Sequence, residues 1–317
     1  MFTLVILAYN EENFIKDTVL QYVAEFENII IIDDASSDDT YKICSALSKN
    51  YENIQLIQNK KNVGAGESLN IGIRVFLESN SKYLIKIDGD NQFKYDDVIK
   101  IKNSTNVKNY DFIKCDRFWE GGIEGNMPAI RYFGNAFASL LLKITTANWS
   151  LNDPLNGLFL FSRKSVENFS LPKLFRRYGY PFYLSTYFSN ISIKQNLLIK
   201  QVKNTISYDN QNSNLSALNM FFKLMYFTLL VFFQKIKTKL QYSGLQISAI
   251  LDIFGFLSFV VSIFCLVRFF LIRYGTLVAS QANWFIVFLI FFFIFIYLIF
   301  QSQKIEYGYK LKYFEES

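Results

Sequence analysis

Tyr83-Leu-Ile-Lys-Ile-Asp-Gly-Asp-Asn-Gln92 is the stretch that decides the fold. Its first residues have the length and composition of a buried strand, and Asp88-Gly-Asp90 follows directly. Side chains two positions apart in an extended chain point the same way, so both carboxylates face one side. Open α/β sheets bind ligands at the carboxyl ends of their strands. The sequence therefore predicts a ligand site at Asp88 and Asp90.

Two carboxylates on either side of a glycine suit a hard divalent cation. Mg²⁺ or Mn²⁺ usually takes one or two carboxylates and fills its shell with phosphate oxygens and water. Gly89 lets a ligand approach the backbone closely. A solvated Asp-Gly turn is the alternative interpretation, and these residues alone do not decide between the two.

Composition predicts a soluble-looking domain joined to a membrane segment. The chain has 317 residues, of which 51% are hydrophobic, and its last quarter holds most of the long apolar runs. The net charge of +6 suits an anionic leaflet or anionic ligands. No basic stripe with interleaved aromatic residues is present, so a nucleic-acid partner is not expected.

Histidine is absent from the sequence. Its absence excludes a His general base, a Ser-His-Asp triad and His-ligated metals, so any such chemistry must use carboxylates. Cys44, Cys115 and Cys265 are far apart, so a disulfide framework or a zinc site is not expected and a reducing compartment fits. Met1–Leu7 lacks a basic region and a cleavage site, and we interpret it as a strand rather than a signal peptide.

Strands and helices alternate along the first part of the chain. Apolar runs predict strands, with helices between them, at Phe2–Ala8, Ile29–Ile32, Ile54–Gln58 and Tyr83–Ile87. The first of these helices is expected to end near Phe26. Such alternation is typical of a parallel, doubly wound sheet. Four polar loops would then meet at one edge: Tyr9–Glu12, Asp33–Asp39, Asn62–Gly66 and Asp88–Gln92.

Each loop also has a purely structural interpretation. Asp33 and Asp34 can simply begin a helix, and Gly64-Ala-Gly66 can be an ordinary turn. The pattern Gly-x-Gly-x-x-Gly is absent after the first strand, which argues against a dinucleotide oxidoreductase. Together and in this order, the loops resemble the family-2 glycosyltransferases of the GT-A fold. The resemblance is strongest to the branch that acts on polyprenyl phosphates, which includes dolichyl-phosphate mannose synthase.

Four motifs carry this resemblance. Leu7-Ala-Tyr-Asn-Glu-Glu12 is similar to the family's Pro-x-Tyr-Asn-Glu signature, with Ala8 in place of Pro. Asp33-Asp-Ala-Ser-Ser-Asp38 resembles the Asp-Asp-Gly-Ser-x-Asp motif that holds base and ribose. Asn62-Val-Gly-Ala-Gly66 resembles Asn-x-Gly-x-Gly, and Asp88-Gly-Asp-Asn-Gln92 resembles the metal motif Asp-x-Asp-x-Gln. The resemblance covers residues 1–210, and the rest of the chain by architecture only.

The resemblance implies roles for individual residues. The ligands of a Mg²⁺ or Mn²⁺ ion would be Asp88, Asp90 and Gln92. A UDP- or GDP-sugar donor would be bound by Ala8, Tyr9, Asn10, Glu11, Asp33, Asp34, Asn62, Gly64, Asp88 and Gly89. The catalytic set would be Asp90, Asp153, Arg117 and Arg131, of which the two arginines would meet the acceptor phosphate.

Independent signals in this later part of the chain are weaker. Arg131 in the first turn of the expected helix 129–144 is unfavourable for the helix dipole, which fits a nearby anion and fits a solvated side chain equally well. Asp153-Pro-Leu-Asn-Gly157 is also a turn signal on its own. The glycine-rich segment 118–128 is a candidate lid. Further strands are expected at Leu158–Ser162 and Leu197–Tyr208.

The last hundred residues predict membrane association. Leu215–Leu240, with Lys235, Lys237 and Lys239, fits an amphipathic helix among lipid headgroups, or else a core helix. Apolar runs of membrane-spanning length follow, a buried soluble hairpin being the alternative, at Ile253–Ile272 and Trp284–Phe300. Basic residues flank the outer ends of this hairpin and predict that both ends are cytoplasmic.

The predicted organisation is a GT-A domain at 1–210, a juxtamembrane helix at 211–245 and a membrane hairpin with a cytoplasmic tail at 246–317. Such a chain would be a multi-pass protein of a bacterial inner membrane, with a homo-oligomer as an open option. The resemblance implies inverting, metal-dependent transfer of a sugar from a nucleotide-sugar to undecaprenyl or another polyprenyl phosphate. This acceptor is largely ionised at neutral pH, since its second pKa is near ~6, and needs no strong base.

Two other functions stay open. A transferase that extends a glycan would carry a Gln-x-x-Arg-Trp motif after the domain and more membrane spans, which the sequence lacks. A scaffold that binds nucleotide-sugars without catalysis is the second, and the intact acids Asp88 and Asp90 count against it.

Overall fold

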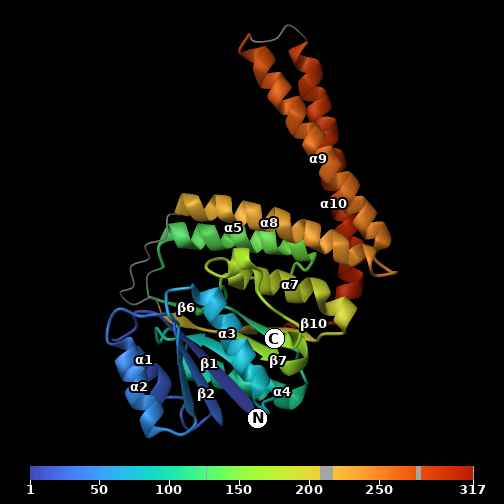
Figure 1. Ribbon diagram of the computed structural model, residues 1–317. Coiled ribbons are helices and arrows are strands. Elements are labelled where there is room, and N and C mark those ends of the chain that lie inside the picture. The colour runs from blue at the N-terminus through green and yellow to red at the C-terminus, as the bar shows by residue number, and fades with distance from the viewer. Residues whose placement is uncertain (126, 208–216, 276–279, 317) are drawn as a thin grey trace. The chain divides into compact units, whose positions relative to one another are not determined.

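The chain forms two compact units. The computed structural model describes residues 1–125, 127–207, 217–275 and 280–316. The first unit comprises Met1–Leu229 with Tyr313–Ser317, and the second comprises Leu230–Lys312 (Figure 1). The last described residues thus belong to the first unit, whereas the sequence suggested that they form a separate tail after the membrane hairpin.

A sheet of eight strands lies at the centre of the first unit, in the order β10-β8-β5-β7-β4-β1-β2-β3. Its strands are β1 (Phe2–Ala8), β2 (Asn28–Asp33), β3 (Ile54–Gln58), β4 (Tyr83–Asp88), β5 (Phe112–Asp116), β7 (Phe159–Ser162), β8 (Ile199–Lys203) and β10 (Phe314–Glu316). Strand β7 runs antiparallel to β4 and β5, and the other pairs are parallel. The predicted α/β class with a mostly parallel sheet is confirmed.

Helices surround this sheet (Figure 1). They are α1 (Ile15–Leu20), α2 (Thr40–Asn50), α3 (Ala65–Glu78), α4 (Tyr95–Val107), α5 (Ala129–Thr146), α6 (Arg163–Val166), the 3₁₀ turn η1 (Lys173–Phe175) and α7 (Tyr180–Gln195). The prediction that the first helix continues to Phe26 is wrong, because α1 gives way to turns after Leu20.

One prediction about the segments after β5 needs correction, and the lid proposed for residues 118–128 stays a prediction. The expected strand Leu197–Tyr208 is divided: β8 ends at Lys203, and beyond it the Thr205 amide donates to Asp97 Oδ2 at 2.6 Å rather than to another strand. Beyond that break, β9 (Ile206–Ser207) pairs with β6 (Ile123–Glu124) in a separate small sheet. The glycine-rich segment therefore contains a strand, and Tyr208 lies outside the described residues.

The central strands are buried on both faces, which explains their unbroken apolar sequences. In β1 every residue from Thr3 to Ala8 is buried. The parallel registers pair Leu7 with Asp88 on β4 and Ala8 with Asp33 on β2. Three of the four predicted loops therefore begin at the same edge of the sheet, as the sequence suggested.

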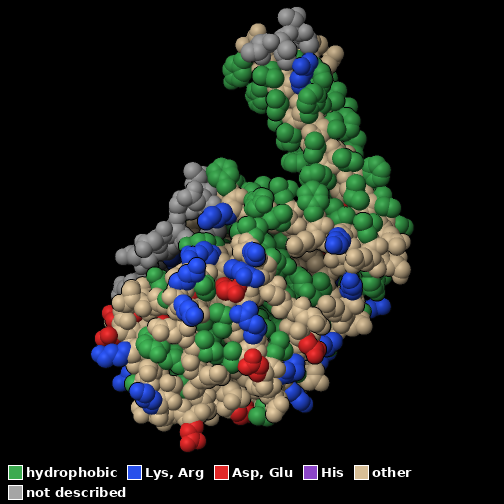
Figure 2. Space-filling view, in the orientation of Figure 1, with side chains coloured by type: hydrophobic (Ala, Val, Ile, Leu, Met, Phe, Trp, Pro, Cys, Tyr) green, Lys and Arg blue, Asp and Glu red, His purple; other side chains and the backbone are tan. Residues whose placement is uncertain are grey.

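The second unit is built on two long antiparallel helices, α9 (Gln246–Arg273) and α10 (Gln281–Lys310), preceded by the end of α8 (Ala217–Leu240) (Figure 1). Both α9 and α10 are long and apolar enough to cross a membrane, as predicted. Only 28% and 6% of their most apolar windows are buried, unlike the helices of a soluble core. Figure 2 shows hydrophobic side chains over most of the visible face of this hairpin.

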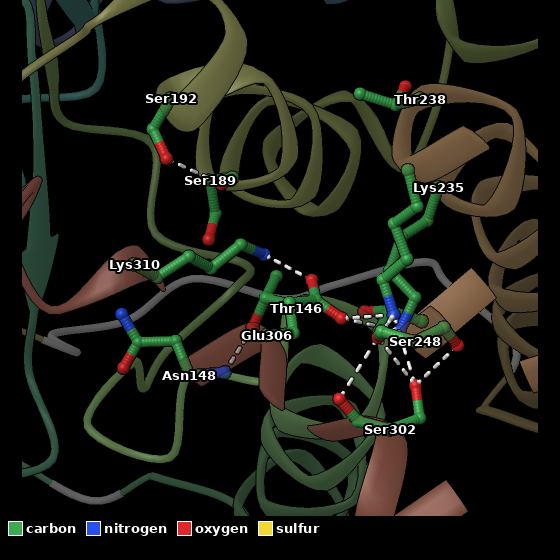
Figure 3. Close-up of polar contacts among 12 residues, drawn as sticks. Thr146, Asn148, Ser189, Ser192, Lys235, Thr238, Ser248, Ser302, Glu306 and Lys310 are labelled. Carbon is green, nitrogen blue, oxygen red and sulfur yellow. Dashed lines mark hydrogen bonds and ion pairs between the residues drawn. The ribbon is translucent and has the colours of Figure 1, made fainter. Parts of the chain in front are cut away.

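Five charged side chains of the second unit are nonetheless buried, and we call them the enclosed cluster: Lys235, Lys239, Asp252, Glu306 and Lys310. Figure 3 labels three of them, Lys235, Glu306 and Lys310. Lys239 Nζ lies 2.6 Å from an Asp252 oxygen and 2.5 Å from a Glu306 oxygen. Lys310 Nζ lies 2.6 Å from the other Glu306 oxygen. The expectation that Lys235 and Lys239 face lipid headgroups is wrong, since both are buried in ion pairs, whereas Lys237 is exposed.

Candidate functional site

The acid pair, Asp88 and Asp90, lies at the carboxyl end of β4. Asp88 keeps 32% of its side chain exposed, and Asp90 is half-buried with Oδ1 accepting the Gln92 amide at 3.2 Å. Burial, and then the negative charge of Asp88, raise the pKa of Asp90 to about 7. The negative charges of the two carboxylates therefore oppose one another, and the Asp88 side chain remains partly accessible to solvent.

A third carboxylate, that of Glu11, interacts electrostatically with the acid pair. Burial raises the pKa of Glu11 to about 8, with further contributions from Asp90, Asp88 and Asp38. Glu11 is held in place through its own amide, which donates to Thr40 Oγ1 at 2.7 Å. This excess of negative charge is what a divalent cation would relieve. No cluster of three or more potential ligands is found among the described residues, so an ion held by the acid pair would complete its shell with water or ligand oxygens, as Mg²⁺ does.

A buried lysine that was not among the predicted site residues contacts Asp88, one member of this pair. Lys86 is fully buried on β4, and its Nζ donates to Asp88 Oδ1 at 2.7 Å, to the Tyr180 hydroxyl at 2.7 Å and to the Gly157 carbonyl at 3.0 Å. Burial lowers the pKa of Lys86, but Asp88 and Tyr180 outweigh it and raise the pKa to about 12. Lys86 is therefore a permanent cation beneath the acid pair.

Gly157 is the point at which the Asp153–Gly157 loop meets the acids. A Cβ atom on Gly157 would lie 2.5 Å from Asp88 Oδ2 and 3.2 Å from Lys86 Nζ, so a larger residue there would force the loop or these side chains to shift. A signal for Lys86 was present in the sequence, since it is the one charge inside the apolar run 83–87. Nothing in the sequence pointed to Gly157 and Tyr180 as its partners.

The predicted donor loops are tied to one another. Tyr9 is 47% exposed, while Ala8 beside it is buried. The Asn10 amide donates to Ser36 Oγ at 3.0 Å, and Asn10 Oδ1 accepts the Ser37 amide at 2.8 Å. The loops after β1 and β2 therefore form one surface, with the Tyr9 ring accessible on it.

Asp33 and Asp34 lie inside that surface and are satisfied by the protein itself. Asp33 is fully buried, and its Oδ2 accepts Gln58 Nε2 at 3.2 Å. The oxygens of Asp34 accept the amides of Val63 and Gly64 at 2.9 and 2.8 Å. These two carboxylates organise the neighbouring loops, and direct contact with a base or ribose would require those bonds to change.

The Asn62–Gly66 loop packs against the segment that follows η1. Gly64 has φ of +95°, and a Cβ there would lie 2.6 Å from Arg177 Cγ. A Cβ on Gly66 would lie 2.5 Å from the Phe175 carbonyl. Arg177 also donates to the Asn62 carbonyl at 2.7 Å. Close backbone packing thus accounts for both glycines.

Arg117 and Asp153 are brought together, and each binds the other. Arg117 Nε lies 2.8 Å from Asp153 Oδ2, Nη2 lies 3.0 Å from Oδ1, and the Arg117 amide donates to Oδ2 at 3.0 Å. Both side chains are buried. Arg131 is half-buried in the first turn of α5. The Arg117 guanidinium is thus bound to Asp153 within the protein, and any contact with an acceptor phosphate would have to accommodate that pair.

Comparison with known proteins places these residues in context. The profile of Glycosyl transferase family 2 matches residues 3–169. An uncharacterised protein of Methanocaldococcus jannaschii is 31% identical over 46% of this chain and 62% of its own length. The UDP-N-acetylglucosamine–dolichyl-phosphate N-acetylglucosaminyltransferase of Methanococcus voltae is 27% identical over 55% of this chain and 74% of its own length.

Solved structures are similar at low identity. S. aureus TarS 1–349 in complex with UDP-GlcNAc aligns with a TM-score of 0.48 and 14% identity, over 77% of this chain and 71% of that protein. The chain spans a little under two thirds of the first curated relatives that it matches, 62% and 65%.

Proposed function

Because the match covers more than half of its length, the chain belongs to Glycosyl transferase family 2, and we propose that it transfers a sugar from a nucleotide-sugar to a polyprenyl phosphate. The acid pair at the carboxyl end of β4 is the observation that carries this proposal. It offers partly exposed, crowded carboxylates at the edge where α/β sheets bind ligands.

Asp88 and Asp90 would hold Mg²⁺ or Mn²⁺ at the donor diphosphate. When bound, the ion supplies charge neutralisation on the departing diphosphate. The exposed ring of Tyr9, beside Asn10 and the loop after β2, is positioned to receive the nucleoside. Asp33 and Asp34 would contribute by fixing the shape of that surface.

The acceptor is proposed to be a lipid phosphate. Two exposed apolar helices of spanning length would keep the chain at a bilayer, where a polyprenyl phosphate is concentrated. The related M. voltae enzyme carries dolichyl phosphate in its name, which supports this class of acceptor. Arg131 would contact the acceptor phosphate, and Arg117 would shape that region through Asp153. Attack opposite the departing diphosphate would invert the anomeric carbon.

A donor screen tests the proposal. Full-length protein in vesicles with undecaprenyl phosphate is supplied with UDP- and GDP-sugars and Mg²⁺ or Mn²⁺, and lipid-linked sugar is measured. We expect a product with at least one donor, and at least a ~100-fold lower rate for Asp90→Asn. Asp96→Asn, an exposed acid in the first turn of α4, is the matched control and should leave the rate unchanged. No product with any donor, or equal rates for the two variants, would contradict it.

A further inference from the structure

Lys86 occupies a position where a lysine is costly. A cation in the interior of a central strand loses its hydration, and only close, well-directed acceptors offset that loss. Lys86 has three such acceptors, on Asp88, Gly157 and Tyr180, all within 3.0 Å. Two of them are neutral, so the carboxylate of Asp88 supplies the charge compensation.

Lys86 changes what the acid pair offers a metal ion. One cation stands against the two carboxylates of the acid pair, with Glu11 as a third nearby, and one oxygen of Asp88 is already engaged at 2.7 Å. The remaining attraction for a free divalent ion is therefore much weaker than that of two unpaired aspartates, and the ammonium also repels such an ion at short range. A nucleoside diphosphate brings the negative charge and the oxygen ligands that the pair lacks.

We propose that Lys86 is a positioning residue that makes divalent-metal binding depend on the diphosphate of the donor. This inference rests on the proposed function, since it takes the acid pair as the metal ligands and a nucleotide-sugar as the substrate. Lys86 suppresses binding of the metal alone, and the metal and the nucleotide bind as a unit.

The geometry keeps Lys86 in this role. Its ammonium is fixed by three bonds from three separate segments and cannot turn away from Asp88 without leaving Gly157 and Tyr180 as well. The absence of a side chain at Gly157 keeps Lys86 and Asp88 in contact, because a Cβ there would press on both. The same bonds link the acid pair to the loop that carries Asp153.

Manganese binding to the full-length protein in detergent tests this inference. Free Mn²⁺ is followed by electron paramagnetic resonance, alone and with UDP or GDP, and protein-free nucleotide titrations are subtracted. For wild type we expect at least tenfold tighter Mn²⁺ binding when one of the nucleotides is present. Lys86→Met should bind Mn²⁺ alone at least tenfold more tightly than wild type and gain less from nucleotide. Lys86→Arg keeps the charge and should behave as wild type.

Tyr180→Phe is the matched control, since it removes one acceptor of Lys86 without changing charge, and its Mn²⁺ affinity should stay within threefold of wild type. Thermal unfolding identifies a variant that fails to fold, and Lys86→Gln then replaces Lys86→Met.

Wild type that binds Mn²⁺ equally well without nucleotide overturns the inference whatever the variants do. So does a Lys86→Met affinity equal to that of wild type. If the wild type binds no Mn²⁺ even with UDP or GDP, the metal site of the proposed function is contradicted as well. If the enzyme forms lipid-linked product but Lys86→Met binds Mn²⁺ no more tightly than wild type, only this inference is overturned.

Discussion

Two groups of lysines and carboxylates among the described residues differ in their access to solvent: the enclosed cluster, and Lys86 with the acid pair. In the enclosed cluster every charged side chain is at most 3% exposed, and lysines and acids are paired on all sides. In the first unit Lys86 is equally buried, but its partner Asp88 is 32% exposed and adjoins a second acid. In a closed network the charged groups bind one another and stabilise the structure, whereas in an open one part of the charge can still bind a ligand.

The largest effect that this comparison predicts is on the closed network. Lys239→Met removes the lysine that bridges Asp252 and Glu306 at 2.6 and 2.5 Å. We expect a loss of about 3 kcal/mol or more, because two buried contacts between charged groups disappear while Lys235 and Lys310 still balance the two carboxylates. The measurement is thermal unfolding in detergent. Lys237→Met, on the exposed side of the same helix, should change stability by less than about 0.5 kcal/mol. Equal effects of the two variants would remove the distinction between closed and open groups.

A middle-sized effect is expected where the open group is most crowded. Gly157→Ala places a Cβ atom 2.5 Å from Asp88 Oδ2, so either the loop or the carboxylate must move, at a cost of about 1–3 kcal/mol. Gly134→Ala in α5 meets nothing within 4 Å and should stabilise the protein by about 0.5–1 kcal/mol. Chemical denaturation measures both. A tolerated Gly157→Ala would show that the Asp88–Lys86 contact is looser than its 2.7 Å distance indicates.

Stability should fall with rising pH in the metal-free protein because of Glu11. Its folded-state pKa of about 8 lies above its ordinary value, so the unfolded chain ionises first and unfolding releases a proton between these two values. Glu11→Gln cannot lose that proton. We expect it to be more stable than wild type by about 1 kcal/mol at pH 8, a figure discounted because the side chain is partly open to water, and equal to wild type only below the ordinary pKa of 4.5. Unfolding with a chelator at several pH values measures this, and parallel curves would contradict it.

The smallest effect belongs to a pair that is open on both sides. Lys94 and Glu124 lie 2.5 Å apart, but 45% and 50% of their side chains are exposed. Lys94→Ala should cost less than about 0.5 kcal/mol, since water and salt compensate exposed charges. Denaturant midpoints provide the measurement. A loss above 1 kcal/mol would show that distance, rather than enclosure, sets the value of an ion pair in this protein.

Local patterns predicted the sheet well because its strands are buried on both faces. The strand Ile54–Gln58 has the predicted bounds, and the four-strand core follows from continuous apolar runs. Strand β10 could not be predicted in this way. Three residues carry no periodicity, and their place beside β8 is set by pairing with a strand more than a hundred residues earlier. The prediction that the lysines of α8 face lipid was wrong for a similar reason, since their partners lie on α9 and α10.

Sequence analysis located the acid pair but not its electrostatic partners. Two aspartates after a strand form a local pattern, whereas the contact between Lys86 and Gly157 joins residues 71 positions apart. Arg117 and Asp153 were each predicted to meet substrate, and their mutual binding could not be foreseen because it depends on tertiary packing. Their predicted contacts with acceptor and sugar stay predictions.

Strand β10 has a practical consequence for anyone who dissects the chain. Phe314 to Glu316 form the outermost strand beside β8, and the Ile199 amide donates to the Tyr313 carbonyl at 2.7 Å. A truncation at residue 210 would remove this neighbour of β8 and leave β8 as an unpaired edge strand that can promote aggregation. An expressed catalytic fragment should instead splice Leu229 to Tyr313 through a designed linker, so that the excised hairpin takes no strand with it.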